Sequence, residues 1–157
     1  MSGLADPAFS SQRPHVASVA ASGLVTAVAE GRTTITASIT AGGVTRTADA
    51  TVIVMGPVAA ALVGQWTGTV AGTYGSAGAT MQLNDDFSMT SVGDSGTYTC
   101  AVAGEWAIAG STLTAASREV ACTRTFIDFV ATVSGTEMTG TWTASSGASG
   151  SFSLGKP

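Results

Sequence analysis

Ionisable and metal-binding side chains are scarce in this 157-residue chain, which has one histidine, two cysteines and only 10% charged residues. An average globular protein carries about 25% charged residues. A tetrahedral zinc site needs about four nitrogen, sulfur or oxygen ligands, and one histidine with two distant cysteines does not supply them. No phosphate loop or dinucleotide fingerprint is present, because the glycines lie between strand patterns. The sequence therefore predicts no metal site and no cofactor.

Basic residues and long apolar runs are also missing. The six Lys and Arg residues are scattered and the formal net charge is −4, which argues against a nucleic-acid partner. No apolar run approaches the roughly 18 residues of a membrane-spanning helix; the longest, Val58 to Val63, is far shorter. The N-terminus MSGLADPAFS lacks the basic and apolar regions of a signal peptide. A signal for export would therefore lie outside this chain.

Small and β-branched residues take the place of charge. Apolar residues make up 45% of the chain, enough to bury a core, and glycine is frequent. Threonine and valine alternate repeatedly, a pattern typical of short strands joined by tight turns. The composition therefore predicts an all-β protein with little disorder.

Residues 16–54 carry the most specific pattern, VASVAASGLVTAVAEGRTTITASITAGGVTRTADATVIV. A short strand, a Ser22-Gly23 turn, a second strand, a long Thr-rich strand and a final ATVIV strand follow one another. This order resembles the C-terminal half of the group 2 bacterial immunoglobulin-like domain. The resemblance implies a bacterial cell-surface or secreted protein, and a spacing or adhesive module more than a catalyst.

Few residues precede this pattern, and they include Pro7 and Pro14. Proline disfavours a long central strand. We therefore expect residues 1–55 to be a truncated Ig-like β-sandwich segment, with its other strands cut away. Such a half-domain leaves a hydrophobic face or a strand edge uncovered. Cover by the second half of the chain or by a partner is the alternative to truncation. Gly56 and Pro57 end the last strand, and residues 56–61 are expected to be a linker.

The second half of the chain, residues 62–157, alternates between strand patterns and turn residues. About eight strands are expected, in an antiparallel meander closed as a barrel or flattened as a sandwich. One of these strands is expected to join EWAIAG with STLTAAS, another to run through EVACTRTFIDF, and a third to join FVATVSG with EMTGTWTA. The three Gly-x-Trp segments, at Trp66, Trp106 and Trp142, are interpreted as similar strand starts in one sheet.

This half also resembles the lipocalin-like small barrels, through LVGQWTGTV, GTYTCAVAGEWAIAGSTLT and MTGTWTASSGASGSFSL. Gly64 and Trp66 match the opening Gly-x-Trp of that group. The resemblance implies that Trp66 plugs one end of the barrel. The segment is shorter than a full lipocalin and shows no long helix.

Cys100 and Cys122 lie in two strand-like stretches. In an exported protein a disulfide between them is the favoured interpretation. Two buried free thiols in a cytosolic fragment are the alternative. A redox role is not expected, because there is no Cys-x-x-Cys arrangement.

No complete set of catalytic residues can be identified in the sequence. GDSG at residues 93–96 is similar to the nucleophile segment of serine proteases, but Thr97 and Tyr98 replace its usual continuation. A nucleophilic serine also needs a base, and His15 lies in the other half of the chain. Asp85 and Asp86, with Asp94 or Asp128 nearby, are candidates for an acid/base pair or a calcium site. Asp85 and Asp86 fit solvated turn residues better. We therefore expect no enzyme.

The remaining candidates are aromatic. Trp66, Tyr74, Trp106 and Trp142 are candidate ligand-binding residues, against the simpler interpretation that most aromatic side chains fill the core. The leading hypothesis is a non-catalytic surface or secreted module for adhesion, spacing or ligand binding, with a glycan or a protein as partner. The alternative is a carrier of a small apolar ligand inside the barrel. The size of the inward-facing residues discriminates between them, because a carrier leaves small residues facing inward.

Overall fold

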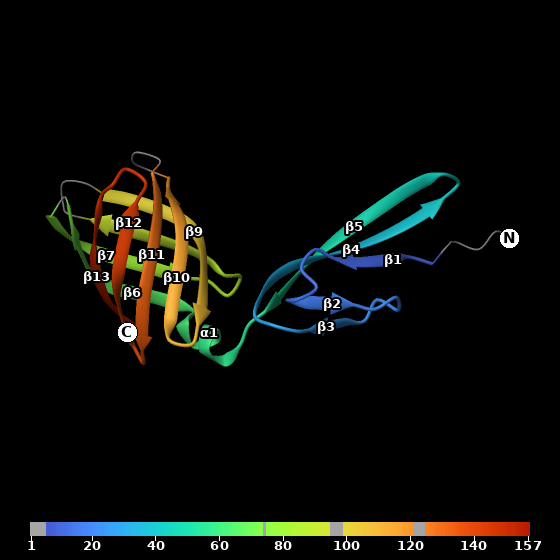
Figure 1. Ribbon diagram of the computed structural model, residues 1–157, viewed down its shortest axis with the longest axis horizontal. Helices are drawn as coiled ribbons and strands as arrows, with labels where there is room; N and C mark the ends of the chain where they lie inside the picture. Colours follow the sequence, from blue (N-terminus) through green and yellow to red (C-terminus); the bar gives the residue numbers. More distant parts are fainter. Residues whose placement is uncertain (1–5, 74, 95–98, 121–124) are drawn as a thin grey trace. The chain divides into compact units, whose positions relative to one another are not determined.

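The computed structural model describes residues 6–73, 75–94, 99–120 and 125–157, and the chain divides into two compact units, Met1–Gly56 and Pro57–Pro157. Both units are built almost entirely of β-strands (Figure 1). The expectation of an all-β chain, with an Ig-like segment followed by an antiparallel barrel, is confirmed.

The N-terminal unit contains two small antiparallel sheets. The larger sheet has the strand order β1-β4-β5, and the smaller sheet pairs β2 with β3. The strands are β1 (Ala8–Ser11), β2 (Ala17–Val19), β3 (Val25–Ala27), β4 (Gly31–Ala41) and β5 (Val44–Val54). β5 begins earlier than the ATVIV segment that was expected to form the last strand.

A tight hairpin joins β4 and β5. Ala41 pairs with Val44, and the two residues between them, Gly42 and Gly43, have φ of 58° and 78°. Two successive positive φ values are typical of the type I′ turn, whose twist matches that of the flanking strands. β5 lies at the edge of its sheet and most of its residues are exposed.

The core of this unit is small. Val16, Ala17 and Ile35 are buried, and the buried Thr33 hydroxyl accepts a hydrogen bond from the Arg13 backbone N–H at 2.9 Å. Several large apolar side chains are exposed, including Leu24 at 68% and Val28 at 58%. Among the described residues, the unit therefore presents both an open strand edge and apolar surface.

The C-terminal unit is a closed eight-stranded antiparallel barrel (Figure 1). Each strand pairs with the next along the chain, and β13 pairs with β6 to complete the ring. The strands are β6 (Gly64–Gly72), β7 (Gly75–Leu83), β8 (Ser88–Asp94), β9 (Thr99–Ala109), β10 (Thr112–Glu119), β11 (Phe126–Ser134), β12 (Glu137–Ala144) and β13 (Ser149–Gly155).

Three strands are divided differently from the sequence-based expectation. FVATVS belongs to β11 and EMTGTWTA forms β12, so these two segments do not join in one strand. β9 runs without a break through EWAIA, so that segment does not join STLTAAS. The stretch 119–129 is not one strand, because β10 ends at Glu119 and β11 begins at Phe126. Since Arg118 pairs with Phe126 in an antiparallel ladder, the chain has to reverse direction between them.

A short helix, α1 (Pro57–Leu62), occupies most of the expected linker. Ala59 and Leu62 are buried, and the Leu62 carbonyl accepts a hydrogen bond from Trp66 Nε1 at 2.9 Å. Lys156 Nζ donates to the carbonyl oxygens of Ala61 and Val63 at 2.6 and 2.7 Å. A cationic side chain thus satisfies carbonyl groups at the end of the helix, and it ties α1 to the strand end that closes the ring.

Several glycines let neighbouring strands of the barrel approach closely. Gly68, Gly104 and Gly140 lie within β6, β9 and β12, and a Cβ atom at any of them would overlap a backbone carbonyl oxygen of the adjacent strand. Strong local curvature of this kind is what a small closed barrel requires. Glycine is therefore needed here for closure of the sheet.

We predict that Gly104→Ala lowers the free energy of unfolding by about 1–3 kcal/mol, because the added methyl group overlaps the Ala116 carbonyl oxygen. Gly78→Ala is the matched control, since its Cβ would meet only Asp94 O at 3.7 Å. Thermal unfolding of both variants checks this. Equal destabilisation by the two substitutions would contradict it.

Candidate functional site

The inward-facing side chains of the barrel change in size along its axis. Six large side chains are almost fully buried toward the end that α1 covers: Trp66, Met81, Leu83, Met89, Leu113 and Met138. Toward the other end, many of the residues that line the interior are glycine, alanine or serine. The interior is therefore solid in one half and hollow in the other.

The hollow half contains a cavity of about 760 Å³. Eight of the residues that line it are glycine or alanine: Ala71, Gly72, Gly75, Ala77, Ala79, Gly93, Ala144 and Ala148. Its deeper lining is apolar and includes Phe129 and Phe152, whose rings meet edge to face with centroids 5.8 Å apart. Such a cavity, apolar with few polar groups, has the character of a small-molecule site.

Polar groups are few around this cavity. The polar residues Ser76, Ser91, Thr125 and Ser146 contribute to its lining, and Glu119 is the one charged residue among the described lining residues. Glu119 Oε2 accepts a hydrogen bond from the Thr125 backbone N–H at 3.3 Å, and Glu119 N donates to Thr125 O at 2.9 Å. The carboxylate is thus held by the backbone of the opposite strand end.

The structure separates the expected ligand-binding tryptophans. Trp66 is fully buried at the closed end, and Trp106 is 3% exposed there, with Nε1 donating to Asn84 O at 3.1 Å. Trp142 lines the cavity and is half-buried, with Nε1 donating to Ala71 O at 3.3 Å. Only Trp142 of the three therefore contacts the hollow half. Tyr74 lies outside the described residues.

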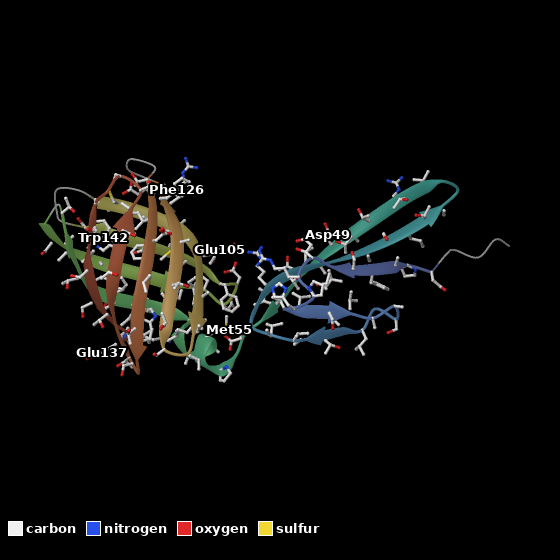
Figure 2. The ribbon with its side chains drawn as sticks, viewed as in Figure 1. Asp49, Met55, Glu105, Phe126, Glu137 and Trp142 are labelled. Atoms are coloured by element: carbon white, nitrogen blue, oxygen red, sulfur yellow. The ribbon has the colours of Figure 1, made fainter. Side chains whose placement is uncertain are left out.

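The interpretation of the three tryptophans as strand starts is wrong for two of them. Trp66 lies near the start of β6, but Trp106 and Trp142 lie toward the ends of β9 and β12. Because a meander reverses direction at each hairpin, the end of β9 lies level with the start of β6. Figure 2 shows Glu137 and Trp142 toward opposite ends of β12.

Cys100 lies on β9, half-buried, and lines the cavity. Cys122 lies outside the described residues, so the pairing of the two cysteines stays a prediction.

The acidic residues considered for catalysis lie at separate places. Asp85 and Asp86 belong to the turn between β7 and β8, where Asp86 Oδ1 accepts a hydrogen bond from Ser88 N at 2.8 Å. Asp94 ends β8, and Asp128 is exposed on β11. His15 is exposed in the N-terminal unit. Ser95 of the GDSG segment lies outside the described residues.

Within the described ranges, no group of three or more His, Cys, Asp and Glu side chains could hold a metal ion. No helix in the same ranges combines the length and the apolar character needed to cross a bilayer.

Sequence reasoning missed Glu119 and the small-residue walls of the cavity. Leu113, Ala115 and Ser117 are buried at alternate positions of β10, and Glu119 continues the same inward series. The alternation of buried and exposed residues along β10 was the signal that could have identified Glu119 as inward-facing. The signal was missed because Glu119 was expected to begin the strand EVACTRTFIDF, whereas it is the last residue of β10.

Comparison with known proteins supports each unit separately. The family profile of the bacterial Ig-like domain (group 2) matches residues 6–52, which begins ten residues before the pattern that carried the resemblance. Domains of this family are typically extracellular or surface-exposed. Among curated proteins, none matches the sequence.

A solved structure of a redesigned β barrel is similar to this chain with a TM-score of 0.54 and 17% sequence identity. The match covers 66% of this chain and 97% of the other. At this identity the likeness concerns the fold alone. Neither the Ig-like family nor this barrel is an enzymatic fold.

We predict that Asp86→Ala lowers the free energy of unfolding by about 1 kcal/mol, because it removes the acceptor for Ser88 N. Asp85→Ala, at the exposed neighbouring position, should change stability by less than about 0.5 kcal/mol. Urea unfolding followed by tryptophan fluorescence checks both values. A larger effect at Asp85 would contradict the assignment of Asp86 as the turn-forming residue.

Proposed function

We propose that this chain is a non-catalytic bacterial surface or secreted module in which the Ig-like unit acts as a spacer and the barrel binds a small apolar ligand. The cavity of about 760 Å³ carries this proposal. Ligand pockets in proteins are about 300–1,000 Å³ and mainly apolar. The cavity is within that range, and its walls are apolar apart from a few polar groups.

The gradient of side-chain size favours a carrier over a barrel that only fills itself. Large residues pack the closed end, so they stabilise the barrel without occupying the other half. Small inward-facing residues in the hollow half leave the cavity unfilled, and they bury less apolar surface than large residues would. This arrangement supports a lipocalin-like use of the barrel, with Trp66 as the plug of the closed end and Trp142 as a wall of the ligand site.

The Ig-like similarity supports the location and the spacing role. Its short paired sheets and charge-poor surface suit a passive module that holds the barrel away from a cell. A cell-surface glycan or protein as the partner is the competing proposal.

Filling the cavity tests ligand binding. We predict that Ala77→Leu, on the cavity wall, weakens binding of an apolar fluorophore such as 1-pyrenemethanol about tenfold or more, because the larger side chain occupies ligand volume. Ala107→Leu, at an exposed position of β9, is the matched control and should bind like the natural chain. The measurement is a fluorescence titration.

Equal binding by all three proteins, or no binding by any, would contradict the cavity as the ligand site. That result would shift support to a glycan- or protein-binding surface module.

We further propose that Cys100 and Cys122 form a disulfide, as suits an exported barrel. The chain expressed under oxidising conditions should have an intact mass two hydrogens below that of the reduced chain. Reduction should lower the free energy of unfolding of the barrel by about 3 kcal/mol. A fully reduced mass after oxidising expression would contradict the pairing and weaken the extracellular assignment.

A further inference from the structure

We infer that the ligand of the barrel contains a flat, fused aromatic ring system, which stacks on the indole of Trp142 and faces the small residues of the opposite wall. This inference rests on the proposed function and names its ligand class. It follows from the way the indole is held against the barrel wall, and from the unequal distribution of large and small side chains around the cavity.

The indole of Trp142 extends across two neighbouring strands. Trp142 of β12 pairs with Gly150 of β13, and Gly150 pairs with Gly72 of β6. The indole Nε1 donates a hydrogen bond to Ala71 O of β6 at 3.3 Å. The side chain therefore begins on β12 and reaches past β13 to β6, where the hydrogen bond fixes its position against the wall.

Two glycines leave the space that this indole occupies. A Cβ atom at Gly150 would lie 2.6 Å from Trp142 Nε1, and one at Gly72 would lie 2.6 Å from Trp142 Cζ2. Both distances are too short for a real Cβ atom, so a side chain at either position would displace the ring. Trp142 and Gly72 line the cavity, whereas Gly150 is not among its described lining residues. The indole thus covers Gly150 and presents an aromatic surface to the cavity.

The aromatic residues of the cavity lie on three adjacent strands. Phe129 of β11 pairs directly with Trp142 of β12, and Phe152 lies on β13. β11, β12 and β13 run side by side in the barrel (Figure 1), and all three aromatic side chains line the cavity. One side of the cavity is therefore a continuous aromatic wall.

The opposite side of the cavity carries small residues. In the closed ring of eight strands, β7 and β8 lie across the barrel from β11 and β12. The lining residues of β7 and β8 include Ala77, Ala79, Ser91 and Gly93. Because their side chains are short, a ring system that stacks on Trp142 has open volume on its other face.

A flat aromatic ligand gains more from this arrangement than a saturated ligand with the same carbon skeleton. Offset-stacked and edge-to-face aromatic pairs are stabilised beyond the burial of their apolar area. A puckered saturated ring buries apolar area but has no π-system. The hydrogen bond to Ala71 O already holds the indole, so binding does not have to immobilise that side chain.

Competition between two alcohols of the same carbon skeleton tests this on the full chain. 2-Naphthalenemethanol is flat, and decahydro-2-naphthalenemethanol is its saturated, puckered counterpart. Each is titrated against bound 1-pyrenemethanol, and the fluorescence of the displaced probe gives the Kd. Burial of apolar area alone would favour the saturated alcohol, which has the larger surface. We expect the natural protein to bind the flat alcohol about fivefold more tightly.

Variants of two tryptophans test whether the preference depends on Trp142. Trp142→Leu should bring the two Kd values within about twofold of each other, because leucine keeps apolar contact without an aromatic face. Trp142→Phe retains a ring and should keep most of the preference. Trp106→Phe is the matched control for Trp142→Phe, since Trp106 lies at the closed end and is not among the described lining residues. It should keep the full preference. Circular dichroism checks that each variant is folded.

The natural protein alone can overturn the inference. Equal affinity for the two alcohols, tighter binding of the saturated one, or displacement of 1-pyrenemethanol by neither would overturn the flat-ring assignment and leave the cavity as an apolar ligand site. An unchanged preference in folded Trp142→Leu would overturn the role of Trp142. Failure of 1-pyrenemethanol itself to bind would overturn the proposed function as well.

Discussion

Closure of the eight-stranded sheet is the constraint on which the barrel depends. A closed ring of this strand number has an interior just wide enough for side chains to fill, so the size of each inward residue decides whether the interior is solid or hollow. Gly68, Gly104 and Gly140 allow the strands to approach closely enough for the ring to close. With the ring closed, large residues at one end supply the core, and small residues at the other end leave the cavity.

The two units contribute different physical properties. The N-terminal unit has a small core and an open β5 edge. The barrel has no open edge, because β13 pairs with β6. The chain thus combines an Ig-like segment with a closed barrel that contains a cavity.

Much of the architecture could be predicted from sequence, because it depends on local patterns. Alternating Thr and Val predicted the strands, turn residues predicted the meander of about eight strands, and the segment 16–54 predicted the Ig-like similarity. The positions of Trp106 and Trp142 along the barrel axis could not be predicted, since they depend on the residues at which each hairpin turns. Glu119 was missed for the same reason, because its inward direction requires the correct end of β10. The cavity itself depends on which small residues face inward together, and that is a property of register across eight strands.

The most direct test of the account is a crystal structure of the full chain under xenon pressure. Xenon binds dry apolar cavities, so density is expected between Ala77, Phe152 and Trp142 in the hollow half of the barrel, and not around Trp66. A cavity filled by ordered waters without xenon, or one closed by repacked side chains, would contradict the claim that the barrel keeps an apolar ligand site.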